Sequence, residues 1–460
     1  VMSLLRNTTA SNNTAFGHSS LKQNTTGTSN VAVGALALDA ATTADNNTAV
    51  GFNAGSTITT GSENTILGGS ALDALTTGTN NVAIGYRALT LATTSSNNTA
   101  VGKDALLANT TGASNTAVGE EALAANTTAS HNIAVGREAL KVNTTGAQNV
   151  AVGNFSLDAN TTASNNTAMG YAALTGNTTA SNNTAVGTNA LFENTTGNSN
   201  VAIGSHALDA NTTGVENVAV GRHAGSAITT GSDNVFVGDL AGQVQTTASN
   251  NTGIGSFALN ANTTGGQNTA VGSLSLDANT TGTRNTSVGY LSLSTNTTGN
   301  DNCSMGRQSL VLNTTGDNNC AFGNSALEQN TTASNNTAVG HESLKANTTG
   351  TDNVAVGANA LDANTTASEN TAVGHNALTD NTTGTSNVAL GRMALGNNTT
   401  ANGSTALGTD ALFTNTTGAE NTSVGHNSMF ANTTGANNVA VGSFALDANT
   451  NGENNTAVGY

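Results

Sequence analysis

The sequence lacks several residue types that most folded proteins use. Proline and tryptophan are absent from its 460 residues, only two cysteines occur, and aromatic residues make up 3% of the chain. Hydrophobic residues reach 36%, below the about 45–50% that is usual in globular domains. Two cysteines exclude a disulfide scaffold, and so few large apolar side chains cannot build a thick core. A thin core that repeats along an axis is the remaining way to fold.

Charged residues are also scarce. They make up 8% of the chain, against about 25% in a typical domain, and the net charge of −16 comes from scattered acids. No basic stripe is present, so no nucleic-acid partner is expected. No run approaches the ~18 apolar residues of a membrane-spanning helix, so no membrane insertion is expected. Residues 1–5 do not read as a signal peptide, and the pattern described next reaches both ends, so we expect a fragment of a longer fibre.

The chain is built instead from one repeat of seventeen residues. A glycine stands at Gly17, Gly34 and every further multiple of seventeen up to Gly459, which makes 27 unbroken copies because 27 × 17 = 459. We number the positions of a copy as phases 1 to 17, with this glycine at phase 17, and call residues that share a phase a row. A short fixed period without loops is typical of a solenoid in which each copy forms one coil. We therefore predict an all-β parallel β-solenoid (β-roll or β-helix) with seventeen residues per coil, continuous over residues 1–460.

The uncharged rows predict the local structure of a coil. Phase 4 is leucine in nearly every copy, phase 14 is Thr, Val, Ile or Cys, and phase 16 is always apolar. Phases 14 and 16 alternate with phase 15 as in a strand, so we predict one strand at 201–203 and its equivalents, and a second at 189–192. Threonine at phases 8 and 9 and asparagine at phases 7 and 13 predict ladders between coils stacked ~4.8 Å apart. Glycine at phase 17 and Gly or Ala at phase 10 predict corners.

Charge is confined to six of the seventeen phases. All 38 charged residues, 11 Lys and Arg and 27 Asp and Glu, fall at phases 1, 2, 5, 6, 11 or 12, and so do all seven histidines. Burying an unpaired ion costs several kcal/mol. The charge-free phases 3, 4, 7–10 and 13–17 are therefore predicted to be enclosed, and the charged phases to face solvent.

Small residues at phases 3 and 15 suggest a partner chain. Phase 3 is always Ala or Ser, phase 15 is nearly always so, and phase 15 lies on the strand face opposite phases 14 and 16. If both faces are covered, a neighbouring chain must cover one of them, which predicts a homo-oligomer, most simply a trimer. The alternative is that the small residues line a narrow interior within a single chain.

Two copies exchange volume between rows. Gly55 replaces the phase 4 leucine while Ile58 and Ile66 add volume at phases 7 and 15, and the same exchange recurs ten copies later. These phases are therefore predicted to share one packed space, in which cavities and overpacking cost about 1–5 kcal/mol. A third copy, with Gly242 and Gly253 at phases 4 and 15, does not fit this rule.

The repeat resembles two related families. Residues 183–187 read Asn-Thr-Ala-Val-Gly and are followed by two variable residues and Ala-Leu. This pattern is similar to the repeats of phage tail-fibre-like proteins, which 166–174 and 177–179 match well, and more distantly to the head repeats of trimeric autotransporter adhesins (YadA-like). The resemblance covers the whole chain. It implies a left-handed solenoid, three chains intertwined or side by side, an extracellular or virion-surface location, and a host-surface receptor or glycan as partner.

No residue departs from the repeat as a catalytic, cofactor-binding or metal-binding residue, so none is predicted and the chain is not expected to be an enzyme. Cys303 and Cys320 stack at phase 14 of adjacent copies, within reach of a disulfide, but in-register stacking directs both side chains the same way, which favours buried thiols. Glu120 and Glu121 are interpreted as a solvated rim rather than an acid and base pair. The histidines show no metal-ligand spacing.

Aromatic residues at phases 1, 2 and 5 are expected on the surface, where they are candidate contacts for sugars or cell surfaces. They include Tyr86, Tyr171, Phe257, Tyr290 and Phe413. Sequons such as 194–196 are interpreted as a by-product of the asparagine rows, since enclosed positions escape glycosylation.

The leading hypothesis is a non-enzymatic structural fibre or shaft, part of a phage tail fibre or surface adhesin that holds or presents a receptor-binding tip. Twenty-seven coils at ~4.8 Å would make a rod of roughly 130 Å. The alternative is a repetitive surface binder, such as an ice-binding or carbohydrate-binding solenoid, or a cell-surface extracellular filament. Ice binding requires threonine on one flat exposed face, whereas the adjacent phases 8 and 9 point to opposite sides of a strand.

Overall fold

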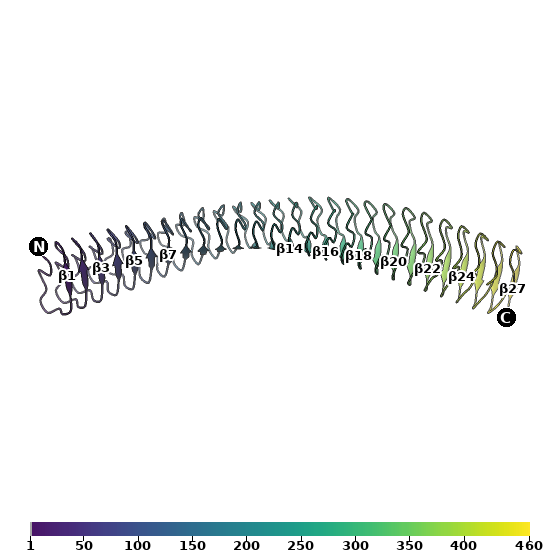
Figure 1. Ribbon diagram of the computed structural model, residues 1–460, viewed down its shortest axis with the longest axis horizontal. Coiled ribbons are helices and arrows are strands. Elements are labelled where there is room, and N and C mark those ends of the chain that lie inside the picture. Colours follow the sequence, from purple (N-terminus) through teal and green to yellow (C-terminus); the bar gives the residue numbers. More distant parts are fainter. Residues whose placement is uncertain (1) are drawn as a thin grey trace. The chain divides into compact units, whose positions relative to one another are not determined.

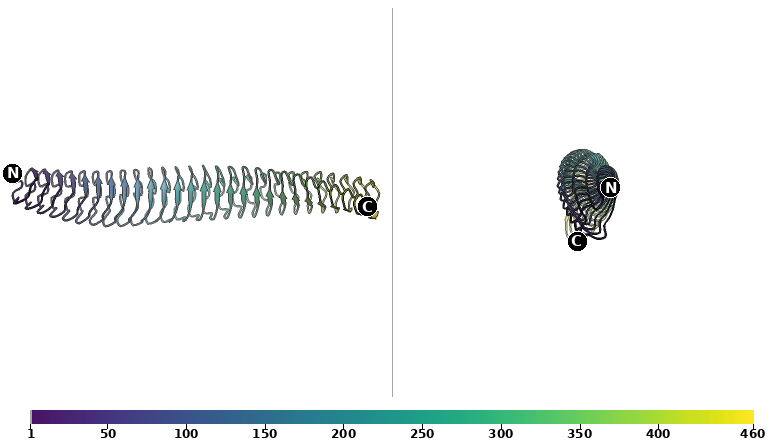
Figure 2. Two further views of the ribbon diagram at one scale, coloured as in Figure 1. Left: turned by 90° about the horizontal axis from the view of Figure 1, so that it is seen from below. Right: turned by 90° about the vertical axis from the view of Figure 1, so that its left-hand side faces the viewer.

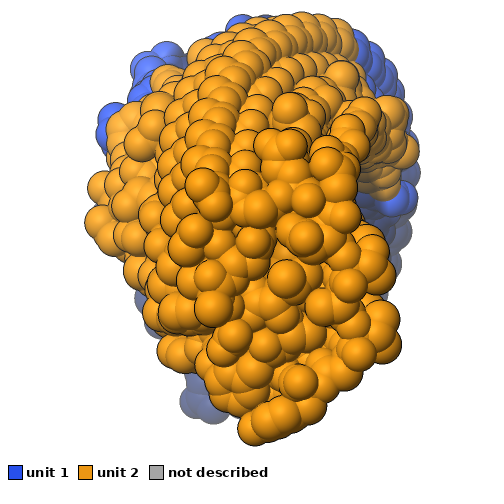
Figure 3. Space-filling view, turned by 90° about the vertical axis from the view of Figure 1, so that its right-hand side faces the viewer, with its two compact units in different colours: residues 1–232 blue, residues 233–460 orange. Residues whose placement is uncertain are grey.

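The structure, a computed structural model, describes residues 2–460 and contains two compact units, one ending at Ser232 and the other running from Asp233 to Tyr460 (Figure 3). Within residues 2–460 every regular element is a short β-strand, and no helix occurs. The predicted all-β class is therefore confirmed.

Each unit contains one strand per coil, always at phases 14 to 16 (Figure 1). The strands of unit 1 are β1 Thr14–Phe16, β2 Val31–Val33, β3 Thr48–Val50, β4 Thr65–Leu67, β5 Val82–Ile84, β6 Thr99–Val101, β7 Thr116–Val118, β8 Ile133–Val135, β9 Val150–Val152, β10 Thr167–Met169, β11 Thr184–Val186, β12 Val201–Ile203 and β13 Val218–Val220. Those of unit 2 are β14 Val235–Val237, β15 Thr252–Ile254, β16 Thr269–Val271, β17 Thr286–Val288, β18 Cys303–Met305, β19 Cys320–Phe322, β20 Thr337–Val339, β21 Val354–Val356, β22 Thr371–Val373, β23 Val388–Leu390, β24 Thr405–Leu407, β25 Thr422–Val424, β26 Val439–Val441 and β27 Thr456–Val458.

Successive strands lie parallel and in register within each unit (Figure 2). Ala185 in β11 is the partner of Ala202 in β12, and Ala338 in β20 is the partner of Ala355 in β21. In both units the partners are one sequence repeat apart, so one lap of the chain takes one repeat and equal phases stack on one another. The predicted parallel β-solenoid and its coil length are therefore confirmed.

The second strand predicted at 189–192 is wrong, because the chain turns there. Asn189 and Leu191 have left-handed φ angles of 54° and 51°, and the same two phases are left-handed in coil after coil. Holding a bulky residue in this region costs about 1–3 kcal/mol. The turn is retained because it directs two adjacent side chains inward, so that Ala190 and Leu191 are both fully buried.

The phase 17 glycines form a corner that no other residue can adopt. Gly289 has a φ of 137°, and a Cβ atom added there would lie 2.5 Å from the carbonyl oxygen of Gly306 in the next coil. Phase 10 is not a corner of this kind. Gly197 is not left-handed there, and Ala180 occupies the same phase with 1% of its surface exposed. Phase 10 is therefore small because it is enclosed, not because of its backbone.

The interior of a coil is lined by phases 3, 4, 7, 10, 13 and 15. In one coil Ala190, Leu191, Asn194, Asn200 and Ala202 expose none of their surface. The predicted enclosure of these phases is confirmed. The predicted enclosure of phases 8, 9, 14, 16 and 17 is wrong, because residues at these phases are exposed or half-buried. Phase 15 faces the inside of its own coil, so the alternative of a narrow single-chain interior is the correct account of phases 3 and 15.

The predicted exchange of volume between rows is confirmed by the packing around Gly55. A Cβ atom added there would lie 2.7 Å from Cδ1 of Ile66 and 2.9 Å from Cδ1 of Ile58. The two isoleucines thus fill the space that a phase 4 leucine occupies elsewhere.

The copy that did not fit this rule is explained by Phe236, the largest fully buried side chain. An added Cβ atom at Gly253 would lie 2.9 Å from Cδ1 of Phe236, and one at Gly242 would collide with the same ring. One phenylalanine therefore takes the interior volume of its own coil and part of the next, and the next coil gives up two side chains.

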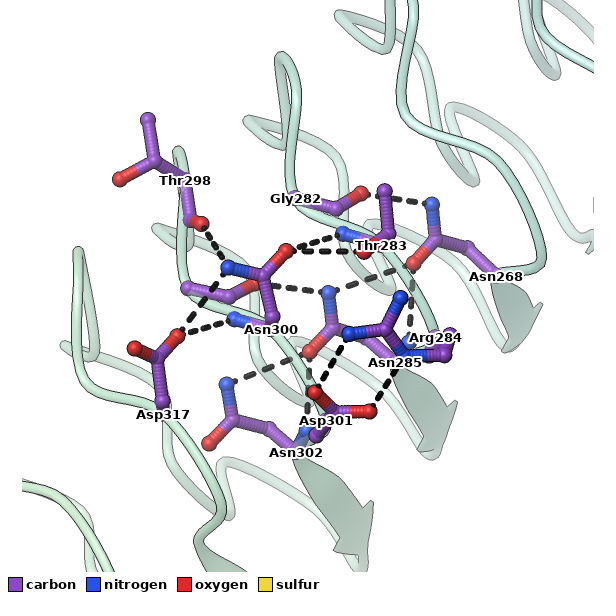
Figure 4. Close-up of polar contacts among 11 residues, drawn as sticks. Asn268, Gly282, Thr283, Arg284, Asn285, Thr298, Asn300, Asp301, Asn302 and Asp317 are labelled. Carbon is purple, nitrogen blue, oxygen red and sulfur yellow. Dashed lines mark hydrogen bonds and ion pairs between the residues drawn. The ribbon is translucent and has the colours of Figure 1, made fainter.

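Two asparagine ladders join adjacent coils, as predicted. At phase 13 the backbone N–H of Asn302 donates to Oδ1 of Asn285 at 3.0 Å (Figure 4). The Nδ2 group of Asn302 also donates to the carbonyl oxygen of Gly316 at 2.8 Å. At phase 7, Nδ2 of Asn296 donates to Oδ1 of Asn279 at 2.9 Å. Where the rows are continuous, each buried amide thus has partners in neighbouring coils, which makes a polar interior tolerable. Where Ala41 and Ile228 interrupt row 7, the Oδ1 atoms of Asn24 and Asn211 have no hydrogen-bond partner in the described part of the chain.

Candidate functional surfaces

The outward side of each unit's sheet consists of rows 14 and 16, which we call the sheet face. Row 16 is apolar in all 27 copies, and in it Leu67 and Met169 expose 49% and 45% of their surface. Row 14 contains only Thr, Val, Ile and Cys, and in it Ile133 is 41% exposed. Neither row contains a charged residue. The sheet face therefore combines exposure with apolar, charge-free chemistry, which sequence reasoning missed because it took absence of charge for burial.

The two threonine rows lie in a bend rather than in the strand that the prediction of opposite sides assumed, and their hydroxyls differ in their contacts. In row 8, Oγ1 of Thr297 donates to the backbone carbonyl of Thr314 in the next coil at 3.0 Å, so this hydroxyl is used within the solenoid. In row 9, Thr298 is exposed. Only row 9 therefore offers a line of threonine hydroxyls to solvent.

Charged residues at row 12 pair along the stack of coils. The guanidinium of Arg284 donates from Nε and Nη2 to the two carboxylate oxygens of Asp301, at 2.6 and 2.8 Å (Figure 4). These bonds lower the pKa of Asp301 below its ordinary value. The pair is exposed, so it contributes little to stability, but it neutralises both charges locally.

Glu120 and Glu121 each pair with a lysine from an adjacent coil. Lys103 lies 3.2 Å from Oε1 of Glu120, and Lys141 lies 2.7 Å from Oε2 of Glu121. The two carboxylates do not converge on a common point, and their partners match the interpretation as a rim.

Several of the aspartates found at phase 5 are half-buried against the coils. Burial raises the pKa of Asp277 to about 6, and its Oδ1 atom has no hydrogen-bond partner among residues 2–460. Burial likewise raises the pKa of Asp158, Asp209 and Asp362. These acids stand on separate coils, and nearby carboxylates add to the effect of burial, Glu138 on Asp158 and Asp380 on Asp362.

Cys303 and Cys320 are in-register partners in β18 and β19, and both are free thiols. The interpretation that they are unbonded agrees with the structure, but the expected full burial is wrong. Both are half-buried because row 14 lies on the sheet face, and this burial raises the pKa of both thiols.

His206 and His223 stack at phase 2 of adjacent coils, with ring centroids 4.9 Å apart. Ser205 Oγ lies 2.8 Å from Nδ1 of His206. The signal for the ring contact was that the two histidines share a phase in consecutive copies, which sequence reasoning did not use. Within residues 2–460 no group of three or more His, Cys, Asp and Glu is placed to hold a metal ion.

The aromatic residues singled out in the sequence are mostly exposed. Tyr86, Tyr171, Phe257 and Tyr290 expose 56%, 55%, 38% and 49% of their surface. Phe413 is half-buried because it stacks on Phe430, with ring centroids 5.5 Å apart.

No pocket is found on the part of the chain that the structure describes, and none of its segments forms an apolar helix of membrane-spanning length.

The sequon at 194–196 begins with a buried amide. Asn194 exposes no surface, and its Nδ2 group donates to Oδ1 of Asn177 at 3.0 Å. A glycan cannot be attached to this nitrogen in the folded coil, which agrees with the interpretation of the sequon as a by-product of the ladder.

The chain matches no protein-family model and no curated protein. Its class is therefore defined by the fold alone: a parallel β-solenoid with one sequence repeat per coil and one short strand in each coil. The candidate functional surfaces are the apolar sheet face, the threonine row and the charged rows beside them.

Proposed function

We propose that this chain is a non-enzymatic structural fibre or shaft, part of a phage tail fibre or surface adhesin that holds or presents a receptor-binding tip. The supporting observation is cohesion between neighbouring coils. Within each unit they are joined from coil to coil by strand pairing, the row 13 ladder and a threonine hydroxyl bond. The row 7 ladder adds to these bonds except where Ala, Ile or Leu occupies phase 7, as at Ala41, Ile58 and Leu75. A buried leucine in nearly every coil adds about 1.5–3 kcal/mol. Such repetition suits a part whose task is length and resistance.

We further propose that this fibre lies outside the cell or on a virion surface, as a left-handed homotrimer without a nucleic-acid partner or membrane insertion. A host-surface receptor or glycan is its expected partner. The surface chemistry is consistent with a passive role, because the charged pairs Lys103–Glu120 and Arg284–Asp301 neutralise each other within the chain. The trimer is proposed from the resemblance of the repeats, since the small residues of phase 15 are covered by their own coil.

Electron microscopy of the purified 460-residue chain tests the proposal. Negatively stained particles should be elongated and uniform in width. Their length should be near the ~130 Å that 27 coils would span. Compact globular particles would contradict a fibre. The mass of the particles, measured by light scattering, gives the number of chains independently of their shape.

A repetitive surface binder is the second candidate, and the exposed threonine row 9 favours it. A single row of hydroxyls at a spacing of ~4.8 Å could match a repeating ligand such as ice or a polysaccharide. Thermal hysteresis of freezing at micromolar protein, lost when several row 9 threonines are changed to lysine, would establish it. We expect no hysteresis, because only one of the two threonine rows faces solvent.

A further inference from the structure

We infer that the sheet face, rows 14 and 16, is the surface through which copies of this chain bind one another. The inference rests on the proposed homo-oligomeric fibre and adds the surface that assembles it. It replaces phase 15, which lies inside the coil, as the contact with a neighbouring chain.

The sheet face is exposed in a single chain but contains no charged residue. Rows 14 and 16 together hold 54 residues, since 27 × 2 = 54, and none is charged, whereas rows 1, 2, 5, 6, 11 and 12 hold all 38 charged residues. Nevertheless Met169, Ile203 and Leu390 each expose at least 40% of their surface in a single chain. Consecutive members of row 16 stack strand by strand within a unit, so the apolar surface is contiguous there. Soluble monomers rarely expose such a patch unless it is an interaction site.

The sheet face is bordered by polar rows that carry charged residues. Along the chain, it is followed by the corner glycine and row 1, and is preceded by row 12 and the buried row 13. Rows 1 and 12 carry ion pairs such as Lys103–Glu120 and Arg284–Asp301. An apolar centre with a polar border is the usual anatomy of a protein–protein interface. These two pairs are satisfied within one chain. Row 12 as a whole holds seven acidic residues against one arginine, so it is a net negative border that has to stay solvated beside the contact.

The area of the sheet face is sufficient for a stable contact. Three residues at ~3.3 Å make a strand face about 10 Å wide, and the 13 strands of unit 1 at ~4.8 Å make it about 60 Å long. This gives about 600 Å² on one copy, or about 1,200 Å² for two, which reaches the lower end of stable interfaces. Unit 2, with 14 strands, has a sheet face of similar size.

A second copy is the occupant that fits a repeating face best, because it has the same strand spacing. Stacked Thr and Val side chains at one period can interdigitate with an identical set at that period, as in dry contacts between paired sheets. In the proposed trimer, three sheet faces would turn toward the common axis.

Paired charge insertions in the full chain test this inference. The variant Met169→Lys with Ile203→Lys places two lysines in row 16 of unit 1. The matched control, Asn165→Lys with Ser199→Lys, places two lysines in row 12 of the same two coils, where both native residues are exposed. A third variant, Met169→Thr with Ile203→Thr, puts the neutral polar residue of row 14 at the same sites. Oligomer mass is measured by multi-angle light scattering over a dilution series, and folding by circular dichroism.

We expect the unmodified chain to be oligomeric, the row 16 lysines to raise the dissociation constant at least about tenfold, and the row 12 lysines to leave it within about twofold. Should the row 16 lysines prevent folding, the threonine variant must still weaken association while keeping the native spectrum. A monomeric unmodified chain, or equal weakening by both lysine variants, would overturn the inference. Particle shape and oligomer mass separate this inference from the proposed function. Elongated particles with the mass of a monomer would overturn the sheet-face contact and leave the proposed fibre standing. A dimer that dissociates when row 16 carries lysines would support the sheet-face contact and overturn the proposed trimer.

Discussion

At the scale of the residue, the most unusual feature is a leucine held in the left-handed region in nearly every coil. Leu191 has a φ of 51° and Leu293 also has a φ of 51°, and both are fully buried. Backbone strain of about 1–3 kcal/mol is offset by the roughly 1.5–3 kcal/mol that burying a leucine contributes. The net contribution of each leucine is small, so the coil depends on its hydrogen-bond ladders as well as on apolar burial.

A glycine at phase 17 should tolerate no side chain. Gly289→Ala would put a Cβ atom 2.5 Å from the carbonyl oxygen of Gly306 at a φ of 137°, and we expect it to lower the unfolding free energy by about 3 kcal/mol or more. Gly69→Ala is the control, because its φ is not left-handed and its nearest neighbour, Tyr86, would be 3.7 Å away. Urea denaturation measures both. Equal losses in the two variants would contradict the corner argument.

The half-buried Asp277 should make the folded chain less stable as pH rises, the opposite of the usual effect of a carboxylate paired with a cation. Its folded pKa of about 6 lies above the ordinary 3.8, so the folded state binds the proton more tightly than the unfolded state. Stability should therefore fall as pH rises from about 4 to about 6, and stay level above that. Asp277→Asn should remove the part of this decline that Asp277 contributes, while Asp158, Asp209 and Asp362 keep theirs. Urea midpoints across the pH range provide the measurement.

Asp301 serves as a control, because its pKa is shifted in the direction opposite to that of Asp277. Arg284 lowers its pKa, so its contribution should be present at neutral pH and be lost as pH falls below about 4. Asp301→Asn should remove that acid-side loss and leave the decline between pH 4 and 6 unchanged. If Asp301→Asn and Asp277→Asn altered the same pH range, the assignment of either group would be wrong.

At the scale of the element, the sequence predicted the strand at 201–203 but not the turn at 189–192. The period of two at phases 14 to 16 shows a strand directly, whereas Asn-Ala-Leu-Phe has no glycine to indicate left-handed backbone. The direction of the strand was also missed. Both faces are charge-free, so composition alone could not say that Ala202 points inward and Ile203 outward. The sheet face was therefore invisible until the strand could be placed on its coil.

The coil that contains Gly55 should tolerate the residues of the preceding coil only if all three positions change together. Ile66→Ala alone leaves a cavity and should cost about 2–5 kcal/mol, and Gly55→Leu alone overpacks the interior and should cost about 1–3 kcal/mol. The triple variant Gly55→Leu, Ile58→Ala and Ile66→Ala recreates the combination of the preceding coil, Leu38, Ala41 and Ala49, and buries no asparagine without a ladder partner. We expect its unfolding free energy to lie within about 1 kcal/mol of the unmodified chain, in a cycle measured by urea denaturation. Additive losses would show that the three sites do not share one space.

At the scale of the whole molecule, a solenoid coil contacts only its neighbours. Removing one complete coil should therefore leave the structure of the other coils and the stability of the chain nearly unchanged. Deleting 341–357 removes one complete coil and joins Gly340 to Ala358 in the correct phase. We expect this variant to keep the native circular dichroism spectrum and a thermal midpoint within a few degrees.

The matched control deletes 341–349 and leaves about half a coil, whose rows cannot pair with either neighbour. We expect it to lose part of its native spectrum and to melt at a clearly lower temperature. If both deletions behaved alike, stacking by phase would not govern assembly of the chain.

The asparagine ladders also bear on how this protein ages. Spontaneous deamidation requires the next backbone nitrogen to attack the side-chain amide carbon, which a rigid, fully bonded amide resists. Asn285 and Asn302 are buried, and each is held in place by the coil beside it, so neither can reach that geometry while the coils stay stacked. Asn402 and Asn451 are exposed, and each is followed by a glycine whose small size leaves room for the attack, so deamidation should start at these two sites. Most asparagines of rows 7 and 13 are thus protected from deamidation by their burial and hydrogen bonds.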